Sequence, residues 1–222
     1  MRVTIFPSKA SGSAQVPPSK SVALRALICG ALSESSTIHN IVYSEDVETM
    51  LRCLKEMGAT VCKKKGSVTI GEMNPFWYPE EQEPILHCDN SGSTFRYLLP
   101  LCLLGDLPTV FVGSSRLINR PMVAYRDFCR QYGLTWLHNE YSVVVRGPLY
   151  ANRFALSDAM SSPFISGLMM AMPLLIEESH IDLESTSEML SYVKLTSAVQ
   201  KAFGVTTVLD GEHITLCPGG VY

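Results

Sequence analysis

The sequence predicts an α/β protein built from three similar units of about 70 residues, arranged around a pseudo-threefold axis with buried helices inside and sheets outside. Three observations predict this. An apolar helix pattern opens with paired serines three times, and an amphipathic helix pattern that ends at a glycine follows each one. Alternating strand patterns complete each unit. The expected unit boundaries are 16–85, 86–155 and 156–222.

The first helix of each unit is apolar on nearly all sides, which indicates a buried helix. Each begins with two serines within three residues, and the three starts are spaced by about 70 residues. The segments are SKSVALRALICGAL from Ser19, SGSTFRYLLPLCLL from Ser91 and SSPFISGLMMAMPLL from Ser161.

The second helix of each unit carries charges on one face only, as expected where a helix covers a core. Gly58, Gly133 and Gly204 follow these helices, and glycine after a last turn is the usual left-handed cap. Short strands come next, including SVTIGE, SVVVRG and HITLCPG.

Composition excludes several classes of function. The 222 residues carry a net charge of −3, so no overall field favours nucleic acid or an anionic membrane. The seven cysteines include no CxxC pair and the five histidines are not at ligand spacing, so we expect free thiols in the cytoplasm and no metal. The longest apolar run, 167–176, is too short to span a bilayer.

The paired serines indicate an anion site. Three helix N-termini that converge around one axis offer unpaired N–H groups and positive dipole ends. Cations stand near each of them: Lys20, Arg25, Arg96 and Arg120, the last just before Pro121, the expected first residue of its helix. The alternative is that each serine is only a helix cap and each cation only a solvated charge.

Other polar residues leave alternatives open. Glu45 and Asp46 stand at a predicted helix start, where they are either capping residues or partners of Lys20. Gly92 is either a turn residue or a point of close ligand approach. No convincing nucleophile–base pair is present, because neither SGS nor SSP is a nucleophile elbow.

At these residues the sequence resembles the family of 5-enolpyruvylshikimate-3-phosphate (EPSP) synthases, the 3-phosphoshikimate 1-carboxyvinyltransferases. The resemblance runs from about Val16 to Gly204. It implies a fold of two domains, each with three βαβαββ units, and a reaction without metal or organic cofactor. The pattern PSKS…R separates this family from the sister transferase that acts on UDP-N-acetylglucosamine. The motifs are PPSKSVALRALICGAL, DNSGSTFRYLLP, NRPMVAYRDFCRQYG and MSSPFISGLMMAMPLL.

The resemblance also implies roles for individual residues. Lys20 matches a catalytic lysine near both substrates, and Asn90 and Arg96 match supports of the glycine loop. Gly92 and Arg120 match the phosphoenolpyruvate pocket, where glyphosate also binds. The residues that match the shikimate 3-phosphate site are Lys20, Ser21, Arg25, Ser161, Ser162 and Tyr192.

The chain departs from the family pattern in several places. Pro163 replaces the usual glutamine, Met189 falls where a phosphate-binding serine is usual, and Tyr97 replaces a proline. Ser187 or Ser191 could replace the missing serine.

Family members are also about twice as long as this chain, and their second domain supplies the acid–base residues. We therefore expect residues 1–15 to form a strand of that second domain. We expect 16–222 to be the N-terminal domain, inactive until the C-terminal half joins it. The alternatives are a non-catalytic phosphate-binding module and the sister transferase.

Overall fold

The computed structural model describes residues 3–4, 6–7, 9, 11–76, 83–157, 159–184, 187–220 and 222, without the side chain of Ser187. Its first unit contains two helices and a three-stranded antiparallel sheet of order β1-β3-β2. The elements are α1 (Lys20–Leu32), β1 (Ser36–His39), α2 (Glu45–Glu56), β2 (Thr60–Lys64) and β3 (Ser67–Gly71).

The second unit adds a four-stranded sheet of order β4-β5-β7-β6, in which β4 and β5 are parallel and the other pairs antiparallel. Its elements are β4 (Ile85–Asp89), α3 (Gly92–Cys102), β5 (Thr109–Gly113), α4 (Ser115–Ile118), α5 (Val123–Gln131), β6 (Thr135–His138) and β7 (Ser142–Arg146).

The third unit repeats this plan, with β8 and β9 parallel in a sheet of order β10-β11-β9-β8. Its elements are β8 (Arg153–Leu156), α6 (Ser162–Ala171), the 3₁₀ turn η1 (Met172–Leu174), β9 (Ser179–Leu183), α7 (Ser187–Ala202), β10 (Thr207–Asp210) and β11 (His213–Leu216).

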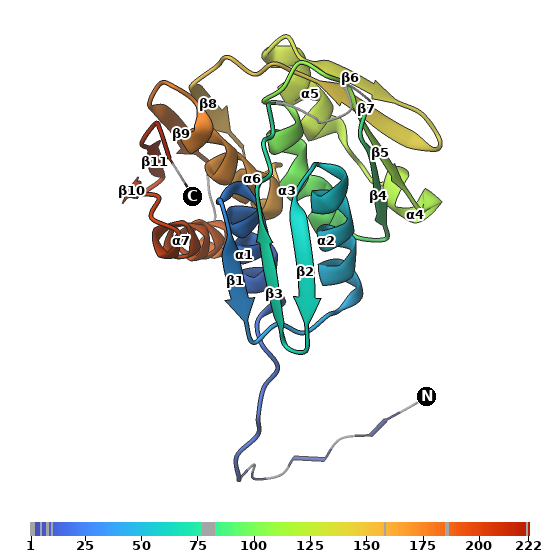
Figure 1. The fold of residues 1–222 in the computed structure, drawn as a ribbon, viewed down its shortest axis with the longest axis vertical. Coiled ribbons are helices and arrows are strands. Elements are labelled where there is room, and N and C mark those ends of the chain that lie inside the picture. Colours follow the sequence, from blue (N-terminus) through green and yellow to red (C-terminus); the bar gives the residue numbers. More distant parts are fainter. Residues whose placement is uncertain are drawn as a thin grey trace.

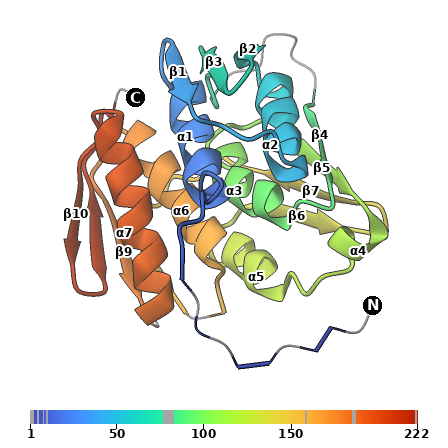
Figure 2. The same ribbon diagram turned by 90° about the horizontal axis from the view of Figure 1, so that it is seen from below.

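The apolar helices α1, α3 and α6 lie inside the molecule, and the three sheets lie outside them (Figures 1 and 2). Helix α6 packs on both α3 and α1. Leu27, Leu98 and Leu168 from the three helices are fully buried. The predicted fold class is therefore confirmed, because helices that are apolar on all sides need neighbours on all sides.

The glycines after the second helices have the left-handed conformation that their position predicts, with φ of 94° at Gly58, 69° at Gly133 and 84° at Gly204. One helix start differs from the prediction. Pro121 is not the first residue of its helix, since α5 begins at Val123 and Arg120 lies in the turn after the short α4.

The described residues that precede α1 leave the molecule as an extended tail (Figure 1). They pair with no strand of the three sheets. Among the residues that the structure describes, the first sheet has no parallel strand like β4 and β8 in the other two. That residues 1–15 belong to a second domain stays a prediction.

Candidate functional site

The N-termini of α1, α3 and α6 lie close together. Side chains in the first two turns of these helices are linked to one another by hydrogen bonds. Ser19 and Ser91 cap α1 and α3, accepting hydrogen bonds from the N–H groups of Val22 at 3.4 Å and Thr94 at 3.3 Å. Ser161, at the start of α6, makes no such cap bond. The capping alternative therefore holds for two of the three serines and leaves the Ser161 hydroxyl for another role.

Ser161 is instead linked to the start of α3 through Tyr125 of α5. The Tyr125 hydroxyl donates to Ser161 Oγ at 2.9 Å and accepts from Arg96 Nε at 2.9 Å. Arg96 Nη1 donates to the carbonyl of Gly92 at 3.1 Å. This chain of bonds fixes Arg96, and among the described residues no acceptor takes the Ser161 proton, which can therefore point toward a ligand.

Two arginines flank Gly92. A Cβ atom placed on this glycine would lie 2.6 Å from Nη1 of Arg120 and 2.6 Å from Nη1 of Arg96. No real Cβ atom is found so close to another heavy atom, so a side chain here would push a guanidinium away. The structure thus brings together Gly92 and Arg120, two of the predicted phosphoenolpyruvate residues.

We predict that Gly92→Ala leaves the fold intact and weakens phosphoenolpyruvate binding. Loss of one charge-assisted hydrogen bond from a displaced guanidinium is expected to cost about 1.5–3 kcal/mol. Titration with phosphoenolpyruvate measures the loss, and titration of the same variant with shikimate 3-phosphate is the control. Equal losses for both ligands would contradict a site confined to phosphoenolpyruvate.

Lys20 lies on the wall of a cavity of about 830 Å³ that α1, α2 and the turn before α3 enclose. Lys20 Nζ donates to Asp46 Oδ2 at 2.5 Å, which answers the question left by the sequence: Asp46 is a partner of Lys20. Burial raises the pKa of Asp46. Hydrogen bonds from Lys20 and Ser91, together with the positive charge of Lys20, lower this pKa by more than burial raises it, so the pKa of Asp46 lies below its usual value.

This lowered pKa predicts how stability depends on pH. The ion pair stabilises the fold above the unfolded Asp pKa of about 3.9, and this contribution disappears as pH falls through the lower folded pKa. Lys20 is half exposed, so we expect about 1 kcal/mol or less. Urea unfolding of Asp46→Asn and wild type between pH 7 and 2 measures it. A difference that persists undiminished at the lowest pH would contradict the pairing.

Arg25, predicted to hold shikimate 3-phosphate, has a fully buried side chain. Its Nε donates to Thr196 Oγ1, its Nη2 to Ser166 Oγ and its Nη1 to the carbonyl of Ser21, each at 2.8 Å. No carboxylate pairs with it among the described residues, so the bonds go to neutral groups alone.

Two aromatic rings complete the cover over Arg25. Its Cζ lies 5.1 Å from the ring centroid of Tyr97 and 5.6 Å from that of Tyr192. Tyr97, which stands where the family pattern has proline, therefore makes a cation–π contact with Arg25. Burial lowers the pKa of Arg25, while the two tyrosines act in the opposite direction. The structure brings Arg25, Ser21 and Tyr192 together.

The remaining predicted residues lie on α6 and α7. Ser162 is the first residue of α6, and Pro163, the second, has no N–H to offer. Met189 is buried on α7 and Ser191 is exposed, while the side chain of Ser187 lies outside the described residues.

Sequence reasoning missed several residues of this end of the molecule. Tyr125, Ser166 and Thr196 lie inside predicted helices with no local signal, and Thr196 is 171 residues from its partner Arg25. The ion pair between Arg52 and Asp89 was also missed. Only the packing of one unit on another reveals these contacts.

The fold and the cationic helix ends together define a class of protein, the three-repeat α/β domains whose helix N-termini suit anions. No helix of the described residues is long and apolar enough to cross a membrane. The family model for EPSP synthase (3-phosphoshikimate 1-carboxyvinyltransferase) matches residues 6–219. The chain belongs to this family, and the family predicted from the motifs is confirmed.

Curated relatives named 3-phosphoshikimate 1-carboxyvinyltransferase agree with the match. That of Clostridium perfringens is 35% identical over 208 residues, which are 92% of this chain and 49% of the relative. That of Clostridium kluyveri is 35% identical over 214 residues, 95% of this chain and 49% of the relative. The chain thus spans about half the length of the curated relatives it matches.

A solved EPSP synthase of Acinetobacter baumannii has the same fold over this region. Its TM-score is 0.76 at 23% identity, and the match covers 94% of this chain and 47% of that one. At this identity the likeness concerns the fold alone.

Proposed function

We propose that this chain supplies the N-terminal half of an enzyme that transfers the enolpyruvyl group of phosphoenolpyruvate to the 5-hydroxyl of shikimate 3-phosphate. The observation that carries the proposal is the gathering of Lys20, Gly92, Arg120 and Ser161 at the convergent helix starts of a family member. In the cell, the reaction would serve aromatic amino acid biosynthesis through the shikimate pathway, in the cytoplasm.

In this proposal the chain positions both substrates and stabilises charge. The α6 start, with Ser161 and Ser162, binds the phosphate of shikimate 3-phosphate, while Ser21, Arg25 and Tyr192 hold its other end. Gly92 and Arg120 bind phosphoenolpyruvate. Lys20 stands between the two anions and stabilises the charge that develops during addition and elimination.

The general acid and base are assigned to the second half, which is also where phosphoenolpyruvate gains further arginines. The described residues of this chain offer Lys20 and Asp46, already paired with each other, and no separate acid–base couple at the helix starts. A non-catalytic phosphate-binding module is the second candidate, favoured by helix N-termini and cations that suit any phosphate.

Binding and turnover by the 222-residue chain test the proposal. We expect shikimate 3-phosphate to bind with a dissociation constant of roughly 0.1–1 mM, because water reaches the site and a half-exposed charge such as that of Lys20 contributes little. Glucose 6-phosphate is the control ligand and should bind less tightly. Ser161→Ala should weaken shikimate 3-phosphate binding and leave the fold intact.

Phosphate release from both substrates distinguishes the two candidates. We expect none from the chain alone and measurable release once the C-terminal half is added, since closure over the substrates needs both halves. Robust release by the chain alone would overturn the half-enzyme assignment. Equal binding of both sugar phosphates would favour the phosphate-binding module.

A further inference from the structure

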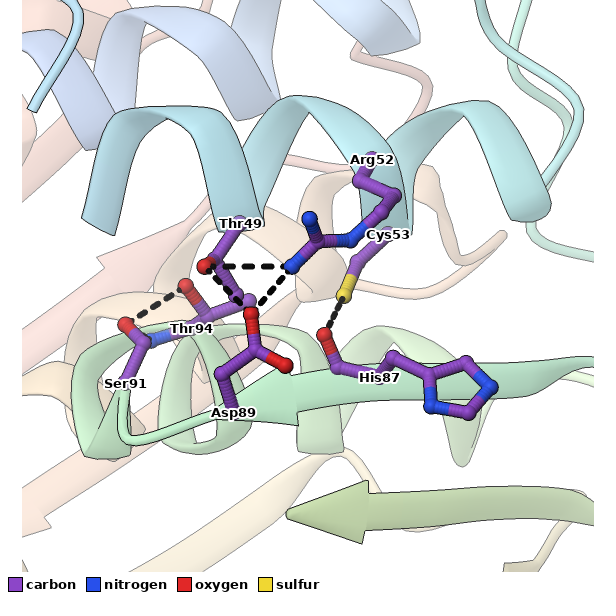
Figure 3. A network of polar contacts seen from close by, with 7 residues as sticks. All are labelled: Thr49, Arg52, Cys53, His87, Asp89, Ser91 and Thr94. Carbon is purple, nitrogen blue, oxygen red and sulfur yellow. Dashed lines mark hydrogen bonds and ion pairs between the residues drawn. The ribbon is translucent and has the colours of Figure 1, made fainter. Parts of the chain in front are cut away.

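A network of polar contacts joins α2 to the turn before α3 (Figure 3). Its residues Thr49, Arg52 and Asp89 line the same cavity as Lys20. Arg52 on α2 donates to Asp89, the last residue of β4, and its Nη2 lies 3.4 Å from Thr49 Oγ1. Thr49 Oγ1 in turn lies 3.5 Å from Asp89 Oδ2. One helix therefore holds a single carboxylate with two side chains one turn apart.

Asp89 has an unusual backbone. Its φ is +48°, in the left-handed region that glycine adopts freely and other residues rarely do. The pairing of β4 with β5 also shifts between His87 and Asp89, so the strand ends in an irregularity. Such a conformation persists only where surrounding contacts hold it.

The turn that follows Asp89 leads directly into the site. Asn90 accepts a hydrogen bond from the Ser114 hydroxyl at 2.6 Å, and Ser91 is the cap of α3. Gly92, beside Arg96 and Arg120, is its first helical residue. A change in φ at Asp89 would therefore move Gly92 and the first N–H groups of α3 relative to the two arginines.

We propose that Arg52 is a positioning residue: by holding Asp89 in its left-handed conformation, it fixes the turn at Asn90–Gly92 against the two arginines. The inference rests on the proposed function for what this turn binds. Arg52 and Asp89 are 48% and 59% exposed, so the pair is weak in water and the expected effects are modest.

The contacts of the Asp89 backbone provide a readout that needs no ligand. The Ser114 N–H donates to the Asp89 carbonyl at 2.8 Å, and the Ser91 N–H donates to the Cys88 carbonyl at 2.7 Å. Amide hydrogen exchange at Ser114 and Ser91 therefore reports local opening of the turn, whereas exchange in the buried helices reports global unfolding.

The first experiment compares amide exchange in Arg52→Gln with that of wild type. We expect exchange at Ser114 and Ser91 to become about three- to fivefold faster, with exchange in α6 unchanged. Lys63→Gln is the matched control, because it removes an exposed ion pair with Glu48 on the same helix and touches nothing in the turn. Unchanged exchange at Ser114, or an equal increase at every amide, would overturn the proposal.

The second experiment places Arg52→Gln in an Asp89→Gly background. Glycine adopts a positive φ without strain, so the turn no longer needs the contact with α2. We expect Arg52→Gln to change exchange at Ser114 less than about 1.5-fold in this background. An equal effect in both backgrounds would mean that Arg52 acts independently of Asp89, and would overturn the inference.

Phosphoenolpyruvate titrations connect the turn to the site. We expect Arg52→Gln to raise the dissociation constant about three- to fivefold, and Lys63→Gln to leave it unchanged. Failure of wild type to bind phosphoenolpyruvate would count against the proposed function and not against the positioning role, which the ligand-free exchange decides. Normal binding by Arg52→Gln despite faster exchange would overturn the role of the turn in binding.

Discussion

Replacing Lys20 by alanine is expected to lower the rate of phosphate release by the chain complemented with the C-terminal half by about 2–4 kcal/mol of transition-state stabilisation. The structure gives the reason. Lys20 stands at the first residue of α1, where its charge adds to the helix dipole, and Asp46 holds it in place at 2.5 Å. An ammonium that is positioned before the reaction needs no reorganisation when charge develops.

A second consequence of Lys20→Ala concerns Asp46. Without the lysine, the carboxylate remains in the cavity wall with Ser91 as its hydrogen-bond partner among the described residues, and it repels anions. The matched control is Lys63→Ala, which removes an exposed lysine from a pair with Glu48 and should change the rate little. A rate near that of wild type in Lys20→Ala would remove Lys20 from the mechanism.

Local patterns in the sequence predicted the fold well. The three glycine caps, the buried central helices and the strand pairs follow from periodicity and from residue types that have one favoured conformation. The predicted start of α5 at Pro121 was wrong by two residues, and the short α4, Ser115–Ile118, was missed because it carries no periodic signal of its own. A four-residue helix is decided by packing and not by sequence pattern.

The candidate site could be predicted only in part, because sequence patterns locate residues along the chain but not their partners in space. Ser161 was expected to face an anion and does lack a cap bond, yet its link to Tyr125 depends on how α5 packs beside α6. Arg25 and Tyr192 were both assigned to the shikimate 3-phosphate site, but their contact and the complete burial of Arg25 were not predictable. Asp89 gave no sign of a positive φ, since aspartate fits many conformations.

The burial of Arg25 leads to the second large expected effect. A cation without a carboxylate partner among the described residues is costly to bury, even with three hydrogen bonds. Such a cost is tolerated where the charge serves a ligand. A substitution that removes the charge but keeps the volume of Arg25 should therefore maintain or raise the stability of the fold and weaken ligand binding. The guanidinium also fills volume between α1, α6 and α7. The cost of burying its charge and the gain from its packing can be separated by the choice of the residue that replaces Arg25.

Arg25→Ala is expected to lower the free energy of unfolding by about 3–5 kcal/mol, because it leaves a large cavity in the core. Arg25→Met keeps most of the volume and removes the buried charge. Ser166 and Thr196 bond each other at 2.8 Å in the wild-type chain, and because this bond does not involve the guanidinium we expect it to remain in the variant. We expect Arg25→Met to unfold within about 1 kcal/mol of wild type, or to be more stable.

Binding of shikimate 3-phosphate should not follow the order of stability. Both variants lose the positive charge beside Ser21 and Tyr192, so both should bind shikimate 3-phosphate more weakly, whatever their stability. Urea unfolding gives the first quantity, and titration of the folded chain with shikimate 3-phosphate gives the second. If Arg25→Met binds as well as wild type, then Arg25 has no part in the site. If Arg25→Met is as unstable as Arg25→Ala, then the hydrogen bonds of the guanidinium outweigh the cost of burying its charge, and Arg25 is retained for the fold.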